Sequence, residues 1–122
     1  MPHTYTWETN GLLRKFTGEI SPENILQSNF ELHVHPKFEE IKYIINDFTE
    51  VTDLIVDVSH TKIYASTDDI ISDTKGKFNI AIVVTKDAHF DLANNYRNEM
   101  KNRSFKCEIF QTIEDARKWV TS

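Results

Sequence analysis

The chain has 122 residues, a formal net charge of -5 and one cysteine, and these properties narrow the classes of protein to consider. The length predicts a single domain, residues 1–122, that buries roughly two thirds of its unfolded surface. The acidic balance argues against nucleic acid as a partner, because binding to phosphates needs a cationic surface. Cys107 has no second cysteine for a disulfide, and no apolar run suits a signal peptide or a membrane span. We therefore expect a cytoplasmic protein without a transmembrane segment.

The first residues predict a β-hairpin. Tyr5 and Trp7 alternate with polar residues, and Leu13 and Phe16 resume the apolar pattern further along the chain. Between these segments stands Asn10-Gly11, the pair that tolerates the positive φ angles of a type I′ turn. We expect one antiparallel strand on each side of this pair.

A short helix is predicted next. Ser21-Pro22-Glu23 offers a capping hydroxyl, a proline where no N–H is needed, and an acid near the positive end of the helix dipole. The helix is expected from Pro22 to about Leu32, because Pro36 prevents its continuation. Its apolar face is predicted to contain Ile25, Leu26 and Phe30, with Asn29 as a gap.

The first central strand is predicted from Tyr43, Ile44, Ile45 and Phe48. We expect it to end at Asn46-Asp47 and to pass into a polar turn through Glu50 and Asp53. A second helix should then run from Ser59 to about Thr74 and end before Gly76, since glycine suits the left-handed residue at a helix C-terminus. Its apolar residues recur at helical spacing: Ile63, Tyr64, Ile70 and Ile71.

The segment from Phe78 to Thr85 is the strongest signal for the fold class. Ile80 through Val84 is apolar without alternation, which is typical of a strand that is covered on both faces. A third helix follows from Asp87, with Ala88, Leu92, Tyr96 and Met100 on one stripe. A strand over 105–110 and a last helix complete the chain. Thr112 and Asp115 form a capping-box variant for that helix, whose inward face should contain Ile113, Ala116, Trp119 and Val120.

This element order predicts an α/β fold with a mixed, mostly parallel five-stranded sheet, an N-terminal antiparallel hairpin and about four flanking helices. Strands that are joined through helices should pair in parallel with right-handed crossovers. We expect the core to contain Trp7, Leu13, Phe16, Ile44, Ile80, Ile82, Val84, Leu92, Ile109 and Trp119.

A ligand site is predicted where two strands end. Asn46, Asp47 and Thr49 follow one predicted strand, and Thr85 and Asp87 follow another. The carboxyl ends of parallel strands share one edge of the sheet, where open α/β folds bind ligands. The alternative is that these side chains cap helices and close turns.

Three other patterns are candidate sites. His33 and His35 have a spacing that two metal ligands use in an extended segment, but Pro36 favours a loop, and we predict no metal site. Asp68-Asp69 and Glu39-Glu40 are interpreted as solvated helix and loop positions. No nucleophile–base arrangement or glycine-rich phosphate loop has local support, and no catalytic residue is predicted.

Three segments, 42–48, 79–84 and 113–119, resemble the SpoIIAA-like superfamily, which includes STAS and CRAL-TRIO domains. The resemblance covers nearly the whole chain. It implies a mixed sheet flanked by helices, often a homodimer, and no cofactor common to the superfamily. STAS relatives that antagonise anti-sigma factors carry a phosphorylated serine in an Asp-Ser-Ser-Gly-like turn, whereas 48–53 and 56–59 here lack the tandem serine and the glycine.

The sequence and this resemblance together predict a non-enzymatic, homodimeric binding or regulatory module for a partner protein or a small apolar ligand. The alternative function is a phospho-switch or a small-molecule enzyme that uses the strand-end residues around Asp47 and Thr49.

Overall fold

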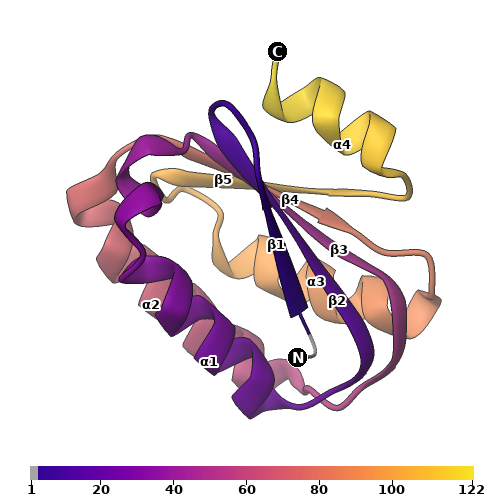
Figure 1. The fold of residues 1–122 in the computed structure, drawn as a ribbon. Helices are drawn as coiled ribbons and strands as arrows, with labels where there is room; N and C mark the ends of the chain where they lie inside the picture. The colour runs from indigo at the N-terminus through magenta and orange to yellow at the C-terminus, as the bar shows by residue number, and fades with distance from the viewer. Residues whose placement is uncertain (1–2) are drawn as a thin grey trace.

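A five-stranded sheet forms the middle of the structure, and its spatial order follows the chain, β1-β2-β3-β4-β5 (Figure 1). The computed structural model describes residues 3–122, apart from the side chains of residues 72–74. β1 pairs with β2 antiparallel, and the other pairings are parallel, which confirms the predicted mixed sheet with an N-terminal hairpin. The strands are β1 (His3–Trp7), β2 (Gly11–Ile20), β3 (Tyr43–Leu54), β4 (Phe78–Val83) and β5 (Phe105–Phe110).

The helices cover both faces of this sheet unequally. They are α1 (Pro22–His33), α2 (Val58–Lys75), α3 (Asp87–Glu99) and α4 (Ile113–Val120), with a 3-10 helix at Pro36–Glu40. Because neighbouring parallel strands follow one another in the chain, right-handed crossovers place α1, α2 and α3 on the same face. Figure 1 shows these three helices together, with α4, in yellow, on the opposite face. Each face of the sheet therefore has its own hydrophobic cluster.

The apolar run in and after β4 lies where the sequence predicts it. β4 is between β3 and β5, and all five residues from Ile80 to Val84 are at most 6% exposed. Ile80, Ile82 and Val84 belong to the cluster under α1–α3, and Ala81 and Val83 belong to the cluster under α4. The lack of alternation thus reflects burial on both faces.

The turn of the hairpin differs from the prediction. Neither Asn10 nor Gly11 has a positive φ; the turn is closed by a hydrogen bond from the Glu8 amide to the Gly11 carbonyl at 2.8 Å, and Gly11 begins β2. The glycine is required by packing instead. A Cβ at Gly11 would lie 2.2 Å from the ring of Tyr43. Close approach of an aromatic ring, and not backbone conformation, explains this residue.

β3 is longer than predicted, and the polar turn through Glu50 and Asp53 does not exist. The strand continues to Leu54 because β2 offers a long partner, with Ile20 opposite Leu54. A register shift after Lys15 places Thr17 opposite Glu50, so β3 has one extra residue there. Asn46 and Asp47 consequently lie inside a strand and not at its end.

The predicted helix caps are confirmed, whereas the predicted buried faces of α1 and α2 are correct only in part. Ser21 Oγ accepts from the Asn24 amide at 3.3 Å, and Thr112 Oγ1 accepts from the Asp115 amide at 3.1 Å. On α1, Phe30 is 68% exposed and Leu26 is also exposed, whereas Ile25, Ser28, Asn29 and Leu32 are buried. On α2, Ile63 and Ile70 are exposed, and Tyr64 and Ala65 are buried.

Half of the predicted core is fully buried: Phe16, Ile44, Ile80, Ile82 and Val84. The other half is only partly buried: Trp7, Leu13, Leu92, Ile109 and Trp119. On α3, Ala88 is exposed and the neighbouring His89 is buried, so the inward stripe begins one residue later than predicted.

α4 is tied to the hairpin by a polar contact at one end of its apolar cluster. Glu8 Oε1 accepts hydrogen bonds at 2.5 Å from both Tyr43 Oη and Arg117 Nη1. Burial and then the Glu8 interactions raise the pKa of Tyr43 to about 12. Burial pushes the pKa of Glu8 upwards, but the hydrogen bonds from Arg117 and Tyr43 and the charge of Arg117 outweigh it, and this pKa is lowered. Glu8 is therefore charged at neutral pH.

Candidate functional site

A cavity of about 100 Å³ lies between the sheet and the layer formed by α1, α2 and α3. Most of its lining is aliphatic and aromatic, as expected for the inner face of a sheet. Polar residues from five elements also reach it, among them Arg14, Asn29, Asn46, Asp68, His89 and Tyr96. Polar groups concentrated in an otherwise apolar cavity are the usual composition of a small-molecule site.

Arg14 is the most unusual of these residues because it is a buried cation, only 5% exposed. In β2 it alternates with Leu12 and Phe16, so strand geometry directs all three to the α1–α3 face. Its Nε donates to Asn46 Oδ1 at 2.8 Å, and its Nη1 donates to Asn29 Oδ1 at 2.8 Å. Nη1 also donates to Ser28 Oγ at 3.0 Å. All three acceptors are uncharged, and no ion pair with Arg14 occurs among the described residues.

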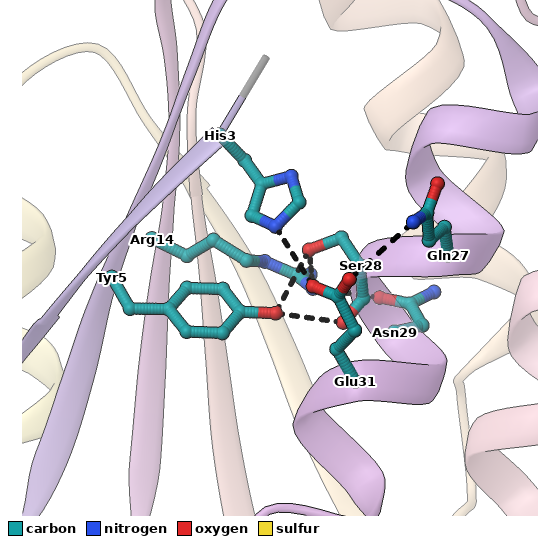
Figure 2. A network of polar contacts seen from close by, with 7 residues as sticks. All are labelled: His3, Tyr5, Arg14, Gln27, Ser28, Asn29 and Glu31. Carbon is teal, nitrogen blue, oxygen red and sulfur yellow. Dashed lines mark hydrogen bonds and ion pairs between the residues drawn. The ribbon is translucent and has the colours of Figure 1, made fainter. Parts of the chain in front are cut away.

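The surroundings of Arg14 are held in place from β1 and α1 (Figure 2). Tyr5 Oη donates to the Ser28 carbonyl at 2.8 Å and lies 3.2 Å from Ser28 Oγ. His3 Nε2 lies 3.2 Å from a carboxylate oxygen of Glu31, one turn further along α1. Burial lowers the pKa of Arg14, but an arginine remains charged at neutral pH. The network therefore keeps a positive charge inside the molecule.

Asp68 supplies the opposite charge from α2. Its side chain is buried; Oδ2 accepts from Tyr96 Oη, and Oδ1 lies 3.5 Å from His33 Nε2. Burial and then the charge of Asp68 raise the pKa of Tyr96 well above its ordinary value, so Tyr96 donates as a neutral phenol. The prediction that Asp68-Asp69 is a solvated pair is wrong for Asp68. Asp69 is half-exposed and pairs with Arg103 Nη1 at 2.7 Å.

His89 is a further buried polar residue of the cavity. It stands in the first turn of α3 and is 5% exposed. Its Nδ1 has no hydrogen-bond partner among the described residues. Burial and then the nearby Lys86 lower the pKa of His89, so the imidazole is neutral at neutral pH. A buried nitrogen without a protein partner is rare in native proteins, and this one is available to a water or to another small molecule.

The structure separates the residues of the predicted strand-end site. Asn46 lines the cavity, but Asp47 follows it in the strand and points to the other face, where its Oδ1 accepts from the Thr49 amide at 2.9 Å. Thr85 and Asp87 are exposed beyond β4. Of the five predicted residues, only Asn46 belongs to the cavity.

Sequence reasoning missed Arg14, Asp68 and His89, although two signals were present. Leu12, Arg14 and Phe16 have the spacing of one strand face, so a charge occupies a position where the alternation predicts an apolar residue. Asn29, interpreted as a gap in the apolar face of α1, is the buried partner of Arg14. When two elements each have a polar residue at a position where the pattern predicts a buried apolar one, the two side chains are candidates for a buried polar contact.

The two closely spaced histidines contact different partners. His33 lies against Asp68, whereas the ring of His35 is 4.5 Å from that of Trp7 and its Nδ1 accepts from the Lys37 amide at 3.1 Å. In the described part of the chain, no three His, Cys, Asp or Glu side chains gather in a way that suits a metal ion. Within residues 3–122, none of the helices has the length and apolar character that crossing a bilayer requires.

The order of the strands, the single antiparallel pairing and the placement of the helices define a SpoIIAA-like α/β fold. A similar solved structure is that of an uncharacterized protein of the DUF3478 family from Shewanella loihica PV-4, described as having a SpoIIAA-like fold. The two chains are 21% identical, the match covers 97% of this chain and 91% of that chain, and the TM-score is 0.54. At this identity the likeness establishes the fold, as the sequence resemblance predicted. No family model and no curated protein matches the chain.

Proposed function

We propose that the chain is a non-enzymatic binding protein that holds a small ligand in the cavity between the sheet and α1–α3. The buried charge of Arg14 is the observation that carries this proposal. Removing a cation from water costs several kcal/mol, and neutral partners offset that cost poorly. Stability alone would favour an apolar residue at this position. A cation beside a cavity is explained by a molecule that it binds.

The volume of the cavity limits the size of the ligand. A cavity of roughly 150 Å³ can hold a benzene ring, and the cavity here, at about 100 Å³, suits a molecule of about that size at most. The ligand that fits without a change in structure has a short apolar body and not a long lipid chain. Half-buried lining residues at the carboxyl end of the sheet, Leu54, Val56 and Leu92, provide the route by which such a molecule enters.

Binding is favoured over catalysis by the partners of the polar groups. Arg14 is hydrogen bonded to Asn46 and Asn29, and Asp68 to Tyr96, so these groups are fixed in position by one another. Asp47 and Thr49, on which a phospho-switch or an enzyme would depend, form a local hydrogen bond away from the cavity. This arrangement supports structural roles for both residues.

An NMR titration of the isotope-labelled protein tests the proposal with benzene, phenol and cyclohexanone. We expect saturable shifts of backbone amides that surround the cavity, such as those of Ile44 and Ile82. Arg14→Met should weaken the binding of phenol and of cyclohexanone by about tenfold, because it removes a charged hydrogen-bond donor. Lys15→Met is the matched control, since Lys15 is the next residue of β2 and points to the other face. Absence of cavity shifts with all three probes in the wild-type protein would refute the proposal.

We also propose that the protein forms a homodimer through α1 and α2. Leu26, Phe30 and Val34 are exposed at four-residue spacing on and just after α1, and Ile63 and Ile70 are exposed on the neighbouring α2. Rows of exposed apolar residues on adjacent helices are typical of protein interfaces. Sedimentation at micromolar concentration should give a dimer that Phe30→Ser converts to a monomer. Phe90→Ser, which alters an exposed phenylalanine on α3, should leave the dimer intact, and a monomeric wild-type protein would contradict the proposal.

A further inference from the structure

The two charged residues of the cavity face it from opposite walls. Arg14 comes from the sheet and Asp68 from α2, and both line the same space. Among the described residues, the Arg14 guanidinium and the Asp68 carboxylate do not form an ion pair, because no nitrogen–oxygen distance between them is as short as 4.0 Å. The charges are nevertheless close enough that Asp68 opposes the lowering of the Arg14 pKa by burial. Because both residues line one cavity and do not pair with each other, a molecule in that cavity can be recognised by both.

The side of the cavity around Arg14, to which β2, β3 and α1 contribute, offers mainly hydrogen-bond donors. The side-chain oxygens of Asn29 and Asn46 already accept from Arg14. Each amide keeps its nitrogen, which only donates, and one lone pair on its oxygen, whereas the guanidinium only donates. Donors therefore outnumber acceptors here, and a ligand atom on this side is best matched as an acceptor.

The helix wall offers an acceptor. An ionised carboxylate has about four lone-pair positions, and one of them on Asp68 is occupied by Tyr96. The contact of the other oxygen with His33, at 3.5 Å, is long for a hydrogen bond. A ligand atom on this side must carry an N–H or O–H.

We propose that the ligand is a small, net-uncharged molecule whose carbonyl oxygen faces Arg14 and whose N–H or O–H donor faces Asp68, on a short apolar body. Arg14 and Asp68 together contribute no net charge, so an anion would be repelled by Asp68 and a cation by Arg14 in a region of low dielectric. A primary carboxamide has both required groups. This inference rests on the proposed function, because it describes the ligand of the same cavity.

Three probes of nearly equal size separate the possibilities: butyramide, butyrate and butylamine. Their dissociation constants are measured at pH 7 from the amide shifts of the cavity residues in the wild-type protein. Butyramide should bind about tenfold more tightly than either charged probe. Butyrate is repelled by Asp68 and has no donor for it, and the butylamine cation is repelled by Arg14 and has no acceptor for it. Tighter binding of butyrate or of butylamine would overturn the inference.

Two variants test the role of each wall independently. Asp68→Asn removes the negative charge with little change in shape, so the preference for butyramide over butyrate should shrink or reverse. Arg14→Met removes the positive charge, so the preference for butyramide over butylamine should shrink or reverse. Lys15→Met should change neither of these two affinity ratios. Unchanged ratios in either folded variant would overturn the inference. If phenol or cyclohexanone fills the cavity but butyramide does not, the ligand class is wrong and the binding function stands; if no probe enters, both proposals fail.

Discussion

The two faces of the sheet bury different kinds of side chain. One face is covered by α4, and the other by α1, α2 and α3. The α4 cluster is apolar and consists of Tyr43, Ile45, Ala81, Val83, Ala116 and Val120. The other face carries the larger apolar cluster and, within it, Arg14, Asn46 and Asp68. The same strands contribute to both, since Arg14 and Lys15, or Asn46 and Asp47, are neighbours that point in opposite directions.

The two faces of the sheet therefore differ in role, one contributing mainly to stability and the other carrying the proposed binding site. A well-packed apolar layer contributes stability in proportion to the area that it buries. Buried polar groups contribute little net stability, and they are unfavourable when their partners are incomplete. Most of the buried polar groups gather on one face around one cavity, which is the face proposed to bind a ligand, whereas Asp47 is the buried polar residue of the α4 face. The α4 face serves mainly to hold the fold together.

The largest expected effect comes from breaking the α4 face. Ile45→Ala removes a fully buried side chain between β3 and α4 and should lower the free energy of unfolding by about 2–5 kcal/mol in urea melts. Ile70→Ala removes an exposed side chain of α2 and should stay within about 0.5 kcal/mol of the wild type. A similar loss in both variants would show that the α4 face does not carry this stability.

A second change overfills the same face. Gly11→Ala places a methyl group against the ring of Tyr43, which must shift and weaken its hydrogen bond to Glu8. We expect a loss of about 1–3 kcal/mol by thermal or urea denaturation. Gly18→Ala is the comparison, because no atom lies near a Cβ there and only its positive φ is unfavourable. An unchanged stability of Gly11→Ala would mean that this packing is looser than the structure indicates.

Acid should weaken the contact between α4 and the hairpin. The pKa of Glu8 is lower in the folded protein than its ordinary value of 4.5, so the unfolded chain binds more protons as the pH falls towards that range. The stabilisation from Glu8 is thus complete above about pH 4.5 and is lost as the pH falls through the lowered value. We expect Glu8→Gln to lose about 1–2 kcal/mol at pH 7 and to approach the wild type in acid. Urea melts of both proteins from pH 7 to pH 3 measure this, and parallel curves would contradict it.

The smallest effect on stability is expected from the cavity face. Arg14→Met replaces a buried charge with an apolar side chain of similar length, a change that is often neutral or stabilising. We expect the free energy of unfolding to remain within about 1 kcal/mol of the wild type while ligand binding is lost. A loss of several kcal/mol would show that Arg14 is structural, and the comparison between the two faces would then fail.

The features predicted correctly from the sequence were those with local causes. Ser21 and Thr112 cap their helices because a hydroxyl beside free backbone donors acts without tertiary context. The run from Ile80 to Val84 identifies a strand covered on both faces, since no exposed strand could have that composition.

The errors arose where tertiary partners decide. β3 continues past Asp47 because β2 is long enough to pair with it, which the composition of 49–54 does not indicate. Alternation cannot assign faces in a strand that is buried on both sides; Leu13 and Phe16 lie three residues apart and therefore face opposite clusters. The inner face of α1 was misplaced for a related reason, because Asn29 is buried by its bond to Arg14, a residue on another element.

The hydrogen bond between Glu8 and Arg117 joins positions 109 residues apart. The segments at the two extremes of the described chain are consequently not independent, because detaching either one deprives the other of a partly buried ionic partner. Local opening of the hairpin and of α4 should therefore occur as one event. Amide hydrogen exchange in these two segments is expected to have a common opening free energy, distinct from that of α1.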